Sequence, residues 1–162
     1  IMLKLIKENN INMRVDSAGT SNYHVDEAPD KRTIANAAKH DVDLKPLRAR
    51  QFKVSDFEKF DKIYVMDKSN MANVLALATN EEQKAKVDLL LNASNPDMNL
   101  EVPDPYFGGE QGFEDVFQMV YKACQHVAFA WYKNLPINYL IVLKNTIFMM
   151  QKVLWNTLLL LG

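Results

Sequence analysis

The chain has 162 residues, 48% hydrophobic and 24% charged, which is enough for one globular domain with a sizeable core. Its formal net charge of −1 argues against a nucleic-acid-binding surface. The single cysteine, Cys124, excludes an internal disulfide and favours a reducing, cytoplasmic environment.

Hydrophobic periodicity predicts helices that alternate with strands. In chain order these are a helix end at 2–10, a strand at 13–17, a helix at 30–40, a short helix with a capping box at 55–58, a strand at 62–66, a helix at 70–79, a short helix that Thr79 could cap, a strand at 87–91 and an amphipathic helix from 113 to about 128. The alternation predicts an α/β fold, a three-layer doubly wound parallel sheet with helices on both faces. Such a sheet normally begins with a strand, so we expect the first strand to lie before residue 1.

The segment 102–107, Val-Pro-Asp-Pro-Tyr-Phe, is the first candidate for chemistry. Each proline fixes its own φ and biases the preceding residue away from helix, so Asp104 is held on a stiff, extended segment. Asp104 could serve as a general acid, with Tyr106 and Phe107 as an apolar wall for a flat substrate. The alternative is a rigid surface loop that carries a solvated carboxylate.

Residues 17–24 follow the end of a predicted strand and form a second candidate. Ligands collect beyond the carboxyl ends of parallel strands, so Tyr23 and His24 could line a site there. A plain surface turn is the alternative. The basic cluster of Arg48 and Arg50 is interpreted as a solvated loop.

Neither a metal site nor a cysteine nucleophile is expected from the sequence. The three histidines, at 24, 40 and 126, have no ligand spacing with another histidine or with the cysteine. Cys124 lies on the apolar stripe of the last amphipathic helix, which is typical of an inert core residue.

Five segments, taken in order, resemble the low-molecular-weight protein tyrosine phosphatase family. They are VDSAGTSNY at 15–23, APD at 28–30, RARQ at 48–51, DKIYVMD at 61–67 and VPDPYF at 102–107. The resemblance extends over roughly residues 1–127, and only the ordered set is specific. It implies a parallel sheet of four strands, of which the first is central and is missing here.

The resemblance also implies a reaction. In complete members a cysteine thiolate attacks the phosphorus of a phosphotyrosine, and no cofactor takes part. That cysteine opens a loop of Cys, five residues and Arg that holds the phosphoryl oxygens. By the same resemblance Asp104 is the general acid, which protonates the leaving phenol and then helps to activate water.

Substrate contacts are implied by the resemblance as well. Tyr106 and Phe107 resemble one wall of a phenol pocket, and Tyr23 resembles the opposite wall. Ser17 resembles a serine that braces the phosphate loop. The implied partners are a phosphotyrosine-containing protein or a small aryl phosphate, and a monomer or weak dimer is expected.

The sequence departs from the family pattern because it contains no Cys-x5-Arg: the residue six positions after Cys124 is Ala130. We expect an N-terminally truncated member without phosphatase activity as written. Loss of a central strand should expose strand edges and lower stability. Two alternatives are a non-catalytic binding remnant, or protein-arginine phosphatase activity in the complete protein.

Residues 129–162 are expected to be an atypical extension of an incomplete phosphatase-like domain at 1–128. From Ala128 onward the chain has three lysines and no acidic residue, and its lysines limit uncharged runs to ten residues. A transmembrane helix needs about 20, so a spanning segment is not expected. A membrane-associating helix, an element that packs on the exposed sheet, and a translated frameshift or non-native end are the alternatives.

Overall fold

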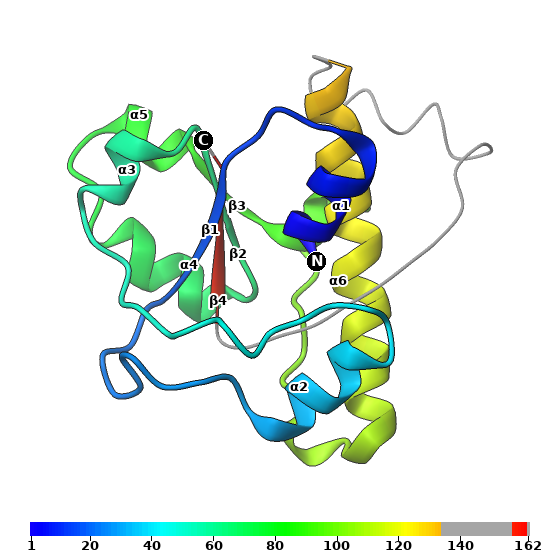
Figure 1. Cartoon of the computed structure of the whole chain (residues 1–162). Helices are drawn as coiled ribbons and strands as arrows, with labels where there is room; N and C mark the ends of the chain where they lie inside the picture. The colour runs from blue at the N-terminus through cyan, green and yellow to red at the C-terminus, as the bar shows by residue number, and fades with distance from the viewer. Residues whose placement is uncertain (134–156, 162) are drawn as a thin grey trace.

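The computed structural model describes residues 1–133 and 157–161, with the exception of the side chains of Phe107 and of residues 157–161. The elements are α1 (Met2–Asn9), β1 (Val15–Gly19), α2 (Lys31–Ala38), α3 (Asp56–Lys59), β2 (Lys62–Val65), α4 (Lys68–Leu75), α5 (Glu81–Ala85), β3 (Val87–Leu89), the 3-10 turns η1 (Leu90–Ala93) and η2 (Pro105–Phe107), α6 (Gly109–Tyr132) and β4 (Thr157–Leu161) (Figure 1). The predicted alternation of helices and strands is confirmed.

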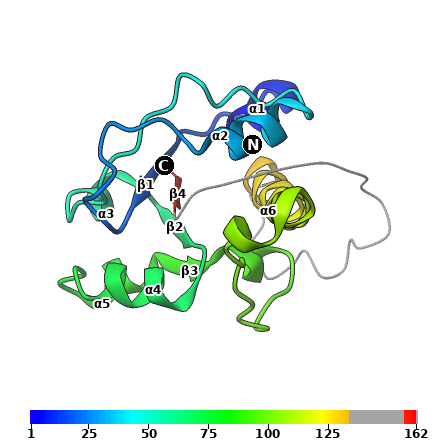
Figure 2. The ribbon, with the colours of Figure 1, turned by 90° about the horizontal axis from the view of Figure 1, so that it is seen from below.

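The sheet has the strand order β1-β4-β2-β3. β2 and β3 are parallel, whereas β4 is antiparallel to both β1 and β2. Helices α1 and α6 lie on one face with α2 packed against α6, and α3, α4 and α5 lie on the other face (Figure 2). The predicted three-layer α/β fold is therefore confirmed.

Burial on both faces explains the apolar run in β2. Ile63 and Val65 belong to the apolar cluster that contains Phe57 of α3 and Val74 of α4. Tyr64, between them in sequence, belongs to the cluster formed with α1 and α6. Successive side chains of a strand point to opposite faces, so a strand at the centre of this sheet needs apolar residues at consecutive positions.

Several helix starts differ from those predicted. α6 begins at Gly109, four residues before its predicted start, and two other helices are capped by side chains other than those expected. Asp67 caps α4 by accepting a hydrogen bond from the Asn70 N–H (2.6 Å), so the helix begins two residues before its predicted start. Asn80 caps α5 through the Gln83 N–H (2.8 Å), and Thr79 is not the cap.

The predicted capping box at 55–58 is wrong, although the short helix α3 is present. Ser55 makes no side-chain capping bond, and its Oγ accepts from Lys59 Nζ instead (3.2 Å). The carboxylate of Glu58 accepts from the side-chain amide of Gln83 (3.2 Å) and so does not return to the helix start.

Strand β4 pairs with β1 and β2 along edges that the sequence analysis expects to be exposed. Its residues pair with β1 from Gly19↔Thr157 to Val15↔Leu161, and with β2 from Tyr64↔Leu159 to Lys62↔Leu161. For residues 157–161 this agrees with the alternative in which the extension packs on the sheet. The membrane-helix and non-native-end alternatives concern the whole extension 129–162; residues 129–132 continue α6, and 134–156 and 162 lie outside the described residues.

No helix in the described part of the chain is long and apolar enough to cross a membrane.

Candidate functional site

The loop that carries Asp104 is attached to the sheet where β2 ends. The N–H of Val102 donates to the carbonyl oxygen of Met66, the residue directly after β2 (2.8 Å). This single backbone bond brings the proline-flanked segment to the carboxyl edge of the sheet, where open α/β sheets place their ligands.

Asp104 is held in the extended conformation that its prolines predict, with φ −72° and ψ 119°. It caps η2, because its Oδ1 accepts from the Tyr106 N–H (2.9 Å), and its side chain is exposed. Pro105 is buried at the start of η2. The loop thus fixes the backbone while it presents a carboxylate to solvent.

Glycines carry the chain from this loop into α6. A Cβ atom on Gly108 would lie 2.8 Å from the Cα of Gly112, which is closer than real Cβ contacts. Gly109 has φ +58°, a conformation that favours glycine. Gly108 therefore forms the turn between η2 and α6, whereas Gly109 and Gly112 lie within α6, and a larger side chain at Gly108 would force the backbone near Gly112 to shift.

Arg32 of α2 fixes the position of Tyr106, and sequence reasoning missed it. Its Cζ lies 4.7 Å from the centre of the Tyr106 ring and 4.8 Å from that of Phe113, and its Nη1 donates to the Tyr106 carbonyl oxygen (3.3 Å). Asp30 clamps the guanidinium through a 2.8 Å Nη2–Oδ2 ion pair.

Arg32 also brings positive charge to the Asp104 loop. Hydrogen bonding to Asp30 raises the pKa of Arg32, and the nearby charge of Asp104 acts in the same direction.

Tyr23 and His24 lie in a different loop, between β1 and α2. The Tyr23 side chain is 85% exposed, and Nδ1 of His24 lies 2.9 Å from Oε2 of Glu27. The structure therefore leaves the Tyr23 ring in solvent and does not pack it against Tyr106, and its role as the opposite wall stays a prediction. The side chain of Phe107 lies outside the described part of the structure.

Ser17 is a residue of β1, half-buried, and it is paired with Leu159 of β4. Its N–H donates to Oδ1 of Asp16 (2.7 Å). The predicted support of a phosphate loop stays a prediction, because the position beside Ser17 is held by β4.

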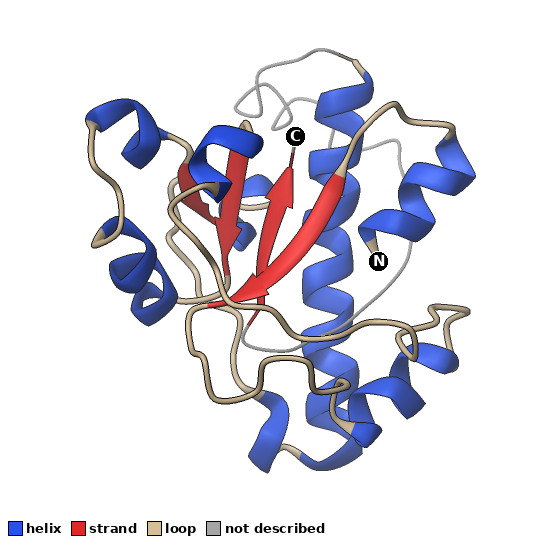
Figure 3. Ribbon diagram, turned by 60° about the vertical axis from the view of Figure 1, so that its left-hand side comes forward, coloured by secondary structure: helices blue, strands red, loops and turns tan. Residues whose placement is uncertain are grey.

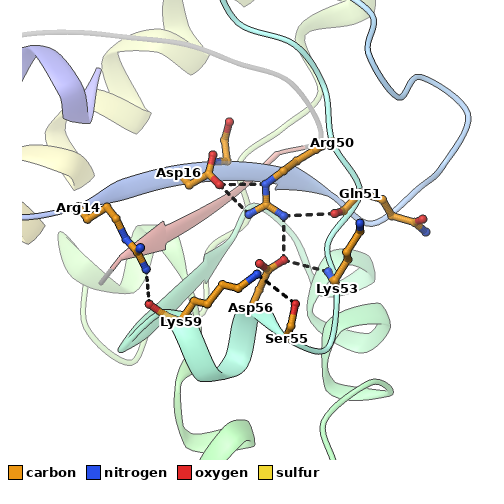
Figure 4. A network of polar contacts seen from close by, with 9 residues as sticks. Arg14, Asp16, Arg50, Gln51, Lys53, Ser55, Asp56 and Lys59 are labelled. Atoms are coloured by element: carbon orange, nitrogen blue, oxygen red, sulfur yellow. Dashed lines mark hydrogen bonds and ion pairs between the residues drawn. The ribbon is translucent and has the colours of Figure 1, made fainter.

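Arg50 is a structural bridge and not part of a solvated loop (Figure 4). Its guanidinium pairs with Asp16 of β1 (Nη2–Oδ2 2.8 Å) and with Asp56 of α3 (Nη1–Oδ2 2.8 Å). Burial disfavours the charged guanidinium, but the hydrogen bonds to Asp56 and Asp16 outweigh it and raise the pKa of Arg50. Arg48, in contrast, is exposed, as the sequence interpretation has it.

No described group of three or more His, Cys, Asp or Glu side chains could hold a metal ion. Cys124 is buried within α6, and burial raises the pKa of its thiol to about 12. A thiol in this state is neutral at physiological pH and cannot act as a nucleophile.

We therefore expect native protein at pH 8 to alkylate at Cys124 at least about a thousandfold more slowly than at an exposed thiol, because only the thiolate reacts. Iodoacetamide labelling of a Ser21→Cys variant, read by peptide mass spectrometry, compares an exposed and a buried thiol in one molecule. Guanidinium should equalise the two rates, whereas equal rates in the native protein would contradict the assignment.

A sequence model described as low molecular weight phosphotyrosine protein phosphatase matches residues 1–136. The chain belongs to this family. A low molecular weight protein-tyrosine-phosphatase from Streptomyces coelicolor is 40% identical over 111 residues, which are 67% of this chain and 66% of the relative. The human low molecular weight phosphotyrosine protein phosphatase is 35% identical over 128 residues, 77% of this chain and 80% of the relative.

Solved structures of the family have the same fold. The crystal structure of a protein tyrosine phosphatase from Entamoeba histolytica superposes with a TM-score of 0.75 at 30% identity, and the match covers 82% of this chain and 85% of that one. The family assignment and the α/β fold expected from the ordered segments are thus confirmed.

Proposed function

We propose that this chain carries the general-acid half of a phosphotyrosine phosphatase site, with Asp104 as the acid. The observation that carries the proposal is the position of Asp104: an exposed carboxylate on a proline-braced loop, tied to the carboxyl end of β2. Tyr106, held by Arg32, supplies one wall for the phenol ring, and Phe107 and Tyr23 are proposed to supply the rest.

The proposed reaction has two steps. A cysteine thiolate attacks phosphorus and the bond from phosphorus to the phenolic oxygen breaks, while the Asp104 carboxylic acid gives its proton to that oxygen. The resulting Asp104 carboxylate then takes a proton from water, whose oxygen attacks phosphorus and releases the thiolate and inorganic phosphate. Ser17 is proposed to brace the loop that supplies the thiolate.

The cysteine of this scheme must come from outside residues 1–162, because the sequence contains no Cys-x5-Arg and Cys124 is buried. The proposed substrate is a phosphotyrosine-containing protein or a small aryl phosphate. We further propose a cytoplasmic location and a monomer or weak dimer.

The chain of 162 residues by itself is expected to show no hydrolysis of p-nitrophenyl phosphate above the buffer rate, since an acid without a nucleophile has no step to assist. Release of p-nitrophenolate by the purified chain measures this, with the human relative as positive control. Turnover that survives Asp104→Ala would contradict both the expected inactivity and the role of Asp104.

A further inference from the structure

β1 and β2 run in the same direction, one strand apart, and only β4 lies between them (Figures 1 and 3). Both strands therefore present a backbone edge toward the same space. An extended segment that enters this space can pair with two strands at once. We call the space between β1 and β2 the strand slot.

Contacts outside β4 tie the carboxyl end of β1 to the segment that leads into β2. The Gly19 N–H donates to the Arg50 carbonyl oxygen (2.8 Å), and the Gly19 carbonyl oxygen accepts from the Phe52 N–H (2.8 Å). The Arg50 side chain then joins Asp16 of β1 to Asp56 of α3, the helix that leads into β2 (Figure 4).

A second contact holds the other end of the slot. Arg14, directly before β1, donates through Nη2 to the carbonyl oxygen of Lys59 at the end of α3 (2.7 Å). Its Cζ lies 4.9 Å from the centre of the Phe60 ring. Both ends of β1 are thus tied to the segment before β2 by contacts in which β4 takes no part.

The slot has apolar side chains on both faces, so an apolar strand fits it best. On one face it meets the cluster that contains Ala18, Ile63 and Val65, and on the other the cluster of Tyr64, against which Val15 packs. A strand in this position needs apolar side chains at consecutive residues. Residues 157–161, Thr followed by four Leu, have such a sequence.

The pairing of β4 with its two neighbours is unequal, so another extended segment can compete with β4 for the edge of β2. β4 pairs with five residues of β1 but with only three of β2. Strand edges accept parallel as well as antiparallel partners, so the direction of β4 is not the only one that the slot admits.

We propose that the strand slot is a peptide-binding site for an extended segment with four consecutive apolar residues, and that residues 157–161 occupy it as an exchangeable strand of the same chain. Backbone pairing on two sides supplies affinity and the two apolar clusters supply selectivity. The proposal does not depend on phosphatase chemistry.

A reversible lock tests this in the full chain. Ser17 and Leu159 are paired across the antiparallel ladder, where Cα atoms lie about 4.5–5.5 Å apart, within reach of a disulfide. Ser17→Cys/Leu159→Cys is expected to form an intrachain disulfide that abolishes binding of a fluorescent peptide with four consecutive leucines. Reduction should restore the binding, and Ser17→Cys alone should bind the peptide in either redox state.

Release of β4 is the complementary test. Proline at 159 removes the ladder N–H, so Leu159→Pro should tighten peptide binding by about tenfold or more relative to Leu159→Val, because an intramolecular competitor is lost. The proposal is overturned if the locked chain binds as well as the reduced one, or if Leu159→Pro binds no peptide. Disulfide-linked dimers on a non-reducing gel would also overturn it, since the strand would then come from a second copy.

Discussion

A chain extended upstream of Ile1 by an apolar strand and a Cys-x5-Arg loop is expected to hydrolyse aryl phosphates, and Asp104→Asn should then lower kcat by about 10²–10⁴-fold. The loss is large because the leaving phenolate would depart without a proton. Asparagine keeps the size of the side chain and its hydrogen bond from the Tyr106 N–H, so the loop that Val102 ties to β2 should be preserved.

The experiment takes the added segment from the human relative and measures p-nitrophenyl phosphate turnover against pH. Asp97→Asn is a matched control, because Asp97 is also exposed and its φ of 62° is one that asparagine adopts readily. Equal kcat for Asp104→Asn and the extended parent chain would remove Asp104 from the mechanism.

The family resemblance implies a central first strand, so we expect the added strand to enter the slot that β4 occupies. Leu159→Pro should then raise the turnover of the extended chain relative to Leu159→Val. This separates the two proposals. Peptide binding without any turnover would contradict the phosphatase proposal alone, whereas turnover that is equal in the two variants would contradict strand exchange alone.

Local chemistry is the part of this molecule that sequence predicts well. The spacing of apolar residues predicts β2 and α6, since one periodic pattern covers each element. The conformation of Asp104 follows from the flanking prolines, whose effect on φ needs no tertiary contact.

Features that depend on distant partners escape sequence reasoning. Residues 157–161 are too short for their periodicity to distinguish strand from helix, and their partner β1 lies more than a hundred residues earlier. Arg50 is joined to Asp16 and Asp56 at unrelated sequence separations, so no motif marks it as a bridge. For Arg32, the nearby Asp30 indicates an ion pair, but the stacking on Tyr106 needs the fold.

Arg50→Met is expected to lower the free energy of unfolding by about 3 kcal/mol, because it leaves the Asp56 carboxylate without its ion-pair partner. The Asp56 side chain is only 4% exposed, whereas Arg50 is 31% exposed, which places the effect at the lower end of the range for buried pairs. Urea unfolding followed by far-UV circular dichroism measures the change.

Arg48→Met is the matched control: Arg48 is exposed and lies in the same loop, so its loss should change stability by less than about 0.5 kcal/mol. Arg50→Met/Asp56→Leu should recover part of the loss, because no buried charge then remains unpaired. If Arg50 also sets the width of the strand slot, the double variant will regain stability yet bind the apolar peptide poorly in a Leu159→Pro background. If the double variant regains both stability and peptide binding, Arg50 serves only to compensate charge, and the backbone bonds of Gly19 are what hold the slot open.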